Sequence, residues 1–187
     1  MLSAKRNTLE KDDWILEKID DFSSIAVFDC GDNDLNDFFR KDAQAHKEQL
    51  LAETYVLLQK KAQGVPVALF SLSNDVIRLE KIKGKIAIPP GKNYRDWPAV
   101  KIGRFGVLKD FQGQNIGSFV LNMIKCLFLT ENRTGCRFIT VDAYNDKKVI
   151  RFYGKNDFQM LTEKDNTKPT RAMFFDLKRL QELKIQC

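Results

Sequence analysis

The sequence lacks the residue patterns on which several common activities depend. It has a single histidine, His46, so a Ser-His-Asp triad would rest on one residue that the helical spacing places at the edge of an apolar helix face. No G-x-S-x-G, Walker or H-E-x-x-H motif occurs. The four cysteines lie far apart without a C-x-x-C pair, and we interpret them as reduced thiols. These absences argue against a hydrolase triad, a zinc site and a disulfide framework.

Long apolar runs are also missing. A membrane span requires roughly 18 or more consecutive apolar residues, and the N-terminal segment breaks into charged residues before any such run forms. We therefore expect a cytoplasmic protein without a membrane partner. The charge is not balanced, because 31 lysines and arginines stand against 25 aspartates and glutamates, a formal net charge of +6. Such an excess favours polyanionic partners, among them nucleic acids and coenzymes that carry phosphate groups.

The composition is sufficient for one packed core. Apolar residues make up 43% of the 187 residues, and fourteen residues are phenylalanine. No internal repeat or low-complexity linker interrupts the chain. We predict a single domain of mixed α and β elements, of the α+β class, over residues 1–187, with residues 1–13 as a loose N-terminal segment.

Hydrophobic periodicity predicts the elements of this domain. The clearest pattern runs over 116–128, where apolar residues recur at helical spacing on one face. A second amphipathic helix begins near residue 34, with Asp32 or Asn33 as its N-cap. The segment 76–98 loses the pattern and is expected to be a loop or a broken element. The other predicted elements are a hairpin of 54–59 and 65–72, strands over 14–19, 100–108, 138–143, 158–162 and 172–177, a helix over 146–153, and a short C-terminal helix.

The most informative segment, RFGVLKDFQGQNIG, spans residues 104–117. A strand here passes through a glycine-containing turn directly into the following helix. The unpaired N–H groups and positive dipole end of a helix N-terminus attract anions, and glycine at 113 and 117 leaves room for a phosphate. A turn that only joins strand to helix would show the same pattern, so both interpretations stay open. The glycines at 103 and 106 indicate a bulge or a close approach of the backbone to a neighbour.

This segment resembles the coenzyme A motif of GNAT acetyltransferases, which is written Gln/Arg-x-x-Gly-x-Gly/Ala. Gln112 occupies the first position and Gly117 the last, whereas Asn115 replaces the first glycine. Because asparagine enters left-handed conformations readily, we expect the loop to keep its shape. The resemblance implies that acetyl-CoA is bound, without a metal. The residues implied to bind it are Phe105, Gly106, Val107, Gln112, Gly113, Gln114, Asn115, Ile116, Gly117, Ser118 and Asn145.

A second stretch, VDAYNDKKVIRFYGKNDF, resembles the strand, Asn, short helix and Phe-Tyr segment that precedes Gly-Phe in the same family. The resemblance implies that Tyr153 is the catalytic general acid, which protonates the departing thiolate of coenzyme A. Asp157 replaces the glycine before Phe158. The spacing alone also allows an ordinary core aromatic at Tyr153, four residues after Val149.

The similarity extends over residues 28–176 and favours one branch of the family, the toxins of toxin–antitoxin pairs that acetylate the amino acid on charged tRNA. It implies a largely antiparallel central sheet, splayed between the strands at 100–108 and 138–143 and flanked by helices, with direct acetyl transfer to a primary amine in a ternary complex. It also implies charged tRNA as acceptor and an antitoxin as partner. The predicted acceptor-binding residues are Lys81, Lys83, Lys85 and Arg95.

Two alternatives of different class remain. One is a GNAT enzyme that acts on a small amine or a protein N-terminus, and the other is a degenerate coenzyme-binding interaction module without turnover. The oligomeric state, monomer or homodimer, is open. The spacing of Asp75, Glu80 and Asp142 also does not say whether one of these carboxylates deprotonates the amine.

Overall fold

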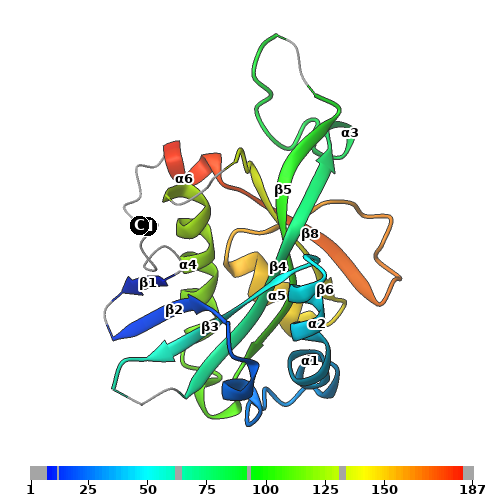
Figure 1. The fold of residues 1–187 in the computed structure, drawn as a ribbon. Coiled ribbons are helices and arrows are strands. Elements are labelled where there is room, and N and C mark those ends of the chain that lie inside the picture. Colours follow the sequence, from blue (N-terminus) through cyan, green and yellow to red (C-terminus); the bar gives the residue numbers. More distant parts are fainter. Residues whose placement is uncertain (1–7, 12, 62–64, 92–93, 131–133, 183–187) are drawn as a thin grey trace. The chain divides into compact units, whose positions relative to one another are not determined.

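The computed structural model describes residues 8–11, 13–61, 65–91, 94–130 and 134–182. The chain divides into two compact units. Unit 1 comprises Met1–Ser73 and Gly103–Ile124, and unit 2 comprises Asn74–Ile102 and Lys125–Cys187. Three elements contribute residues to both units, namely β4 (Pro66–Arg78), β5 (Asp96–Val107) and α4 (Ile116–Thr130) (Figure 1).

Unit 1 is built on antiparallel strands. β1 (Thr8–Lys11), β2 (Trp14–Lys18) and β3 (Glu53–Gln59) pair one after another, and β3 pairs with β4 as the predicted hairpin. The strand order of this unit is β1-β2-β3-β4-β5. The prediction of a loose segment over 1–13 is wrong for residues 8–11, because their backbone groups pair with the edge of β2. Residues 1–7 and 12 lie outside the described part of the chain.

Helices cover both faces of these strands. α1 (Asn33–Asp37), the π-helical turn η2 (Phe38–Asp42) and α2 (Ala43–Glu48) follow one another along the chain and supply one side of a core. The buried members of that core are Ile19, Ile25, Phe28, Cys30, Phe38, Phe39, Ala43, Val56 and Leu69. On the other face, Trp14 contacts Phe119 of α4, with ring centroids 6.0 Å apart. Two 3₁₀ turns, η1 (Phe22–Ile25) and η3 (Lys109–Phe111), complete the unit.

Unit 2 combines parts of β4 and β5 with β6 (Phe138–Tyr144), β8 (Thr170–Asp176) and β7 (Gln159–Met160), in the order β4-β5-β6-β8-β7. β5 and β6 pair in parallel from Ala99 to Ile102, and the pairs β6–β8 and β7–β8 are antiparallel. The parallel pairing ends at Ile102 although β5 continues to Val107. The helices of this unit are α3 (Leu79–Ile82), α5 (Lys147–Lys155) and α6 (Lys178–Glu182).

The structure confirms a mixed α and β fold with a largely antiparallel sheet and flanking helices. The predicted irregular segment 76–98 is partly regular, because β4 continues to Arg78, α3 follows, and β5 begins at Asp96. The intervening segment forms only an isolated bridge between Lys83 and Ile86. That residues 1–187 form a single domain stays a prediction. Among the described residues, no helix is long and apolar enough to cross a membrane.

The cysteines differ from the sequence interpretation at one position. Cys30 and Cys136 are free thiols, and Cys187 lies outside the described residues. Cys126 is disulfide-bonded, so the interpretation of four reduced thiols is wrong for this residue. Spacing along the chain does not reveal which Cβ atoms the fold brings within the roughly 4 Å that a disulfide requires.

Asp32 begins the first helix of unit 1. Its backbone is extended, with φ of −111°, and its Oδ1 accepts the N–H of Leu35 at 3.1 Å. This bond satisfies one of the N–H groups that the first helical turn leaves without an acceptor.

Replacing Asp32 with Ala should lower the free energy of unfolding by about 1 kcal/mol, because a first-turn N–H loses its acceptor. Asp37→Ala is the matched control, since Asp37 lies in the same helix and forms only an exposed ion pair with Lys41. Urea titrations of both variants measure the effect. Equal stability of the two variants would contradict the capping role.

Candidate functional site

The loop between β5 and α4 has two residues in the left-handed region. Gly113 has φ of 77° and Asn115 has φ of 62°. Asn115 therefore adopts the conformation that the sequence predicted for it in place of glycine. A Cβ atom at Gly113 would meet nothing within 4 Å, so the backbone there borders open space. The loop therefore has, at Asn115, the left-handed backbone conformation that glycine would adopt there.

Gln112 fastens this loop to the neighbouring backbone. Its Nε2 donates to the carbonyl oxygen of Cys30 at 2.8 Å and to that of Val107 at 2.9 Å. Gln114 acts similarly, because its Nε2 donates to the Asp110 carbonyl at 2.8 Å. The side chain of Gln112 thus shapes the loop, because its amide donors are committed to the backbone, and coenzyme binding by Gln112 stays a prediction.

The loop and the first turn of α4 fit a pyrophosphate. Residues 112–115 are exposed, and Ile116 behind them is buried. The first intrahelical bond is the one that Phe119 N–H donates to the Asn115 carbonyl, at 3.0 Å. The N–H groups of Ile116 and Gly117 precede that bond and have no acceptor within the helix, which leaves them available to an anion at the positive end of the dipole.

The glycines of β5 are needed for packing inside unit 1. A Cβ at Gly106 would lie 3.0 Å from both Cβ and Sγ of Cys30, and a Cβ at Gly103 would lie 3.1 Å from Oγ of Ser71. The close approach expected from the sequence is confirmed, and the neighbours are these side chains. Phe105 and Val107, on either side of Gly106, are half-buried.

Tyr153 lies on α5 in unit 2 and is buried, with 5% of its surface exposed. Its ring makes edge contacts with Phe152 and Phe158, at centroid distances of 5.1 and 5.3 Å. Burial raises the pKa of Tyr153 above the ordinary value for a phenol, so the hydroxyl keeps its proton at neutral pH. This environment suits a proton donor, and it equally describes a core aromatic, so both interpretations remain.

The turn after Tyr153 keeps its geometry without the family's glycine. Asp157 has φ of 66°, and the N–H of Phe158 donates to the Tyr153 carbonyl at 3.1 Å. Aspartate is among the few residues that tolerate this region. The replacement at 157 therefore does not disturb the end of the tyrosine helix.

Lys125 is a residue that the sequence analysis missed. It is 4% exposed, its Nζ donates to the Asn156 carbonyl at 2.9 Å, and it lies 4.2 Å from the ring centroid of Phe175. Burial lowers the pKa of Lys125, because desolvation disfavours the ammonium form. The lysine anchors the C-terminal turn of α5. The sequence did contain a signal for its burial, because Lys125 lies among the apolar residues of the helix predicted over 116–128.

The hydrogen bonds of Asn145 give it a structural role. Its Nδ2 donates to the carbonyl oxygens of Asn166 and Lys168, both at 2.9 Å, and its N–H donates to the Pro169 carbonyl. The side-chain donors therefore fasten the segment before β8. Direct contact with a coenzyme through Nδ2 would require these bonds to break, so coenzyme binding by Asn145 rests on the resemblance alone.

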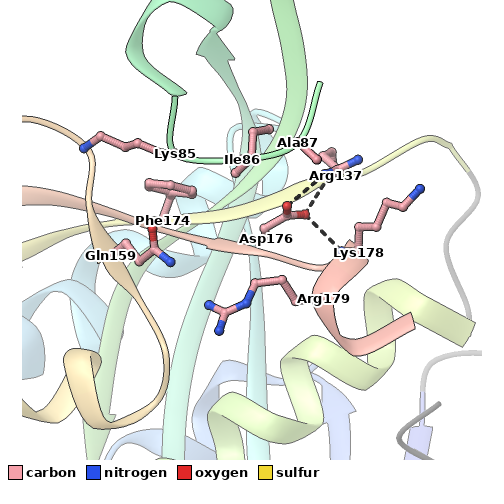
Figure 2. Close-up of a pocket in the computed structure, with 9 residues that line it drawn as sticks. All are labelled: Lys85, Ile86, Ala87, Arg137, Gln159, Phe174, Asp176, Lys178 and Arg179. Carbon is pink, nitrogen blue, oxygen red and sulfur yellow. Dashed lines mark hydrogen bonds and ion pairs between the residues drawn. The ribbon is translucent and has the colours of Figure 1, made fainter. Parts of the chain in front are cut away.

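Basic residues surround a cavity in unit 2 (Figure 2). Its volume is about 200 Å³. Asp176 accepts two hydrogen bonds from Arg137, at 2.6 and 2.8 Å, and the dashed lines in Figure 2 mark this pairing. The other lining residues are Lys85, Ile86, Ala87, Gln159, Phe174, Lys178 and Arg179. One carboxylate thus stands against four cationic side chains, which makes the lining positive.

The four predicted acceptor-binding residues all lie in unit 2 and are exposed. Lys85 lines the cavity, and its Nζ donates to the carbonyl oxygens of Met160 and Leu161 at 2.6 and 3.2 Å. Lys81, Lys83 and Arg95 form no ion pair with any described residue. Lys85 is thus partly committed to the fold, whereas the other three cations are available to a partner.

No protein-family model matches the chain. Solved structures do match it over nearly their whole length. The fold is similar to that of a tyrosine-to-phenylalanine mutant of KacT, with a TM-score of 0.73 and 22% identity over 92% of this chain and 99% of that one. AtaTR bound with acetyl-CoA matches with a TM-score of 0.69 and 22% identity, over 94% and 100% of the two chains. AtaT complexed with acetyl-methionyl-tRNAfMet matches with a TM-score of 0.70 and 20% identity, over 92% and 100%.

The chain has the fold that these three structures share. At this level of identity the likeness establishes the fold, and the activity has to be argued from the residues.

Proposed function

We propose that the protein is an acetyl-CoA dependent N-acetyltransferase that acetylates a primary amine, namely the α-amine of the amino acid on charged tRNA. The observation that carries the proposal is the loop of residues 112–115, whose two left-handed residues lead into the N-terminus of α4 in a chain with this fold. The similar structures include complexes with acetyl-CoA and with an acetylated aminoacyl-tRNA.

The loop residues have defined roles in this proposal. The N–H groups at the start of α4 bind the pyrophosphate, Gly113 and Asn115 shape the turn, and Gln112 keeps it attached to the end of β5. The backbone of Phe105, Gly106 and Val107 lies alongside the pantetheine arm, as the resemblance implies. Gln114, Ile116, Gly117 and Ser118 complete the cradle. Acetyl-CoA, when bound, supplies an activated acetyl thioester.

Tyr153 is proposed as the general acid. Because burial raises its pKa, the hydroxyl stays protonated through the neutral range and can donate to the departing sulfur. The anchored turn at Asn156 and Asp157 holds the helix end that carries Tyr153.

The proposed acceptor is charged tRNA. Support comes from the positive cavity, the exposed Lys81, Lys83 and Arg95, and the excess of basic residues in the chain. An antitoxin partner and a cytoplasmic location belong to the same proposal, since the similar structures include a toxin bound to the C-terminus of its antitoxin. Asn115 and Asp157 adopt the backbone conformation that glycine would supply, which supports an intact coenzyme loop and tyrosine turn, and the module without turnover remains the alternative.

Labelled acetyl-CoA, incubated with the purified protein and a cell extract, tests the acceptor class. We expect label in the RNA fraction that alkaline treatment releases together with the amino acid. Label in protein or in small molecules would favour the alternative acceptor, and absence of transfer would favour the module without turnover.

Gly117→Glu should abolish acetyl-CoA binding, because the added carboxylate repels the pyrophosphate at the helix start. Gly135→Glu is the matched control, since Gly135 is exposed in a loop of unit 2 and borders open space. Isothermal calorimetry measures both affinities. An unaltered affinity in folded Gly117→Glu would mean that the phosphates bind elsewhere.

Tyr153→Phe should lower kcat by about 10²-fold or more, the usual size of a lost general acid, with little change in acetyl-CoA affinity. Tyr94→Phe removes the same hydroxyl from a residue that is 82% exposed and should leave kcat unchanged. The wild-type kcat should also not fall as the pH rises to about 9, because the raised pKa keeps Tyr153 protonated. Retained kcat with reduced melting temperature would identify a core aromatic instead.

A double variant, Lys81→Ala with Lys83→Ala, should raise KM for charged tRNA and reduce the salt dependence of kcat/KM. The log–log slope should fall by about one unit for each tRNA phosphate that these lysines neutralise in the wild type. Lys85 is left intact because it supports the backbone. The control variant removes two exposed lysines of unit 1, Lys41 and Lys61. Equal slopes for both variants would exclude tRNA binding by Lys81 and Lys83.

A further inference from the structure

Asp75 is a half-buried carboxylate that forms no ion pair with any described residue. It lies on β4 in unit 2, is half-buried, and its Oδ2 accepts a hydrogen bond from Oγ1 of Thr140 at 2.5 Å. Thr140 is itself 5% exposed, so the hydroxyl that holds the carboxylate is almost completely removed from water.

The other shielded acids of unit 2 are paired. Among the residues whose exposure is described, three acidic side chains of this unit are not exposed. Asp165 pairs with Arg171 at 2.7 Å and Asp176 pairs with Arg137 at 2.6 Å. Asp75 alone has no lysine or arginine within ion-pair distance in the described part of the chain. A partly desolvated carboxylate that lacks a counter-ion is unusual, because a hydrogen bond from one neutral hydroxyl offsets only part of its lost hydration.

The surroundings of Asp75 strengthen its attraction for a cation. Ile77, two residues along β4, shares its side of the strand and belongs to a buried apolar cluster with Ala99 and Phe138. Phe138 in turn lies two residues before Thr140 on β6. Asp75 and Thr140 therefore each lie two residues along their strand from a member of this buried apolar cluster, and charges interact more strongly near apolar groups than in water.

We propose that Asp75 is a catalytic residue, which binds the ammonium group of the acceptor and accepts one of its protons, and that Thr140 is the positioning residue that orients the carboxylate. This inference rests on the proposed acetyltransferase function and supplies the base that the sequence did not identify. The ligand class is a primary ammonium group, here the α-amine of an aminoacyl ester.

The protons and bonds balance as follows. Asp75 accepts one proton from the ammonium group, which gives the nitrogen its lone pair. The nitrogen then forms a bond with the acetyl carbon while the C–S bond breaks, and Tyr153 gives its proton to the sulfur. The nitrogen releases its second proton to water, from which Tyr153 is reprotonated, and Asp75 returns its proton to solvent. No oxidant or further reactant is consumed.

This role predicts a particular pH dependence. An α-amine has an ordinary pKa of about 8, so roughly 1% of it is neutral at about pH 6. With Asp75 as the proton acceptor the ammonium form of the amine reacts, and the population of that form is nearly constant between about pH 6 and 7. Without that carboxylate only the neutral amine reacts, so the rate should rise about tenfold per pH unit.

The experiment measures kcat/KM for Asp75→Asn between about pH 6 and 8, with total tRNA charged with amino acids as acceptor. We expect kcat/KM of the wild type to be independent of pH in the lower half of this range. At the acid end, kcat/KM of Asp75→Asn should be about 10²-fold lower than that of the wild type, and its logarithm should then rise with pH with a slope near one. Asp96→Asn, an exposed acid on β5, should follow wild type. If Asp75 had a purely structural role, kcat/KM of Asp75→Asn would be reduced by the same factor at every pH, and this result would overturn the proposal. The proposal would also be overturned if the pH slope changed in Asp142→Asn and not in Asp75→Asn.

A binding measurement without acetyl-CoA provides a second readout. At about pH 6, wild type should bind charged tRNA about tenfold more tightly than uncharged tRNA, the size of one charge-assisted hydrogen bond, and Asp75→Asn should bind both equally. Thr140→Val should reduce this preference and Thr140→Ser should restore it, with unchanged melting temperatures. A preference that survives in Asp75→Asn would overturn the proposal. Failure of wild type to acetylate any RNA would instead overturn the proposed acceptor, so the two failures are distinguishable.

Discussion

Three segments of this chain are each held by a polar side chain that donates to backbone carbonyl groups. Gln112 fastens the loop between β5 and α4, Lys125 fastens the helix end after Tyr153, and Asn145 fastens the segment before β8. The Lys125 bond is buried, and a buried donor without a partner costs about 1–3 kcal/mol, so of the three this bond carries the largest penalty for breaking. The loops are therefore shaped by side chains that do not themselves have to touch a substrate.

This constraint explains how the chain tolerates replacements of glycine. Asn115 and Asp157 occupy left-handed positions that glycine takes in the motif, and the hydrogen bonds on either side of them are present. A side chain at such a position costs roughly 1–2 kcal/mol, less for asparagine and aspartate. The surrounding bonds are sufficient to hold the backbone there. The left-handed turns are thus present although the motif's glycines are replaced, which is also consistent with a shared fold at 22% identity.

Among the acids of unit 2 that are not exposed, Asp75 differs from the others in its pairing. Arginine neutralises Asp165 and Asp176, and the second of these is the carboxylate that lines the basic cavity. Asp75 is held by a hydroxyl, which orients a carboxylate without neutralising it. The proposal of charged tRNA as acceptor rests on both features, the basic cavity and the Asp75 carboxylate, because charged tRNA is an anion along its backbone and carries an ammonium group at its reacting end.

The sequence by itself determined the elements with strong periodicity, because the pattern of one helix face or of one hairpin is local. The helix of α4, the hairpin of β3 and β4, the N-cap at Asp32 and the left-handed Asn115 were all predicted correctly for this reason. The edge strand β1 was missed, since so short and polar a segment forms a strand only when a partner edge is available.

Only the tertiary structure decided which side chains meet across long separations in sequence. Asp75 and Thr140 are 65 residues apart, and Lys125 and Asn156 are 31 apart. The positions of Asp75, Glu80 and Asp142 in the sequence do not distinguish one of these acids from the others, because the environment of a carboxylate depends on which residues the folded sheet places beside it. Partial burial, the lack of an ion-pair partner among the described residues and the orientation by a hydroxyl arise from the packing of the chain, and the chemistry of a carboxylate depends on them.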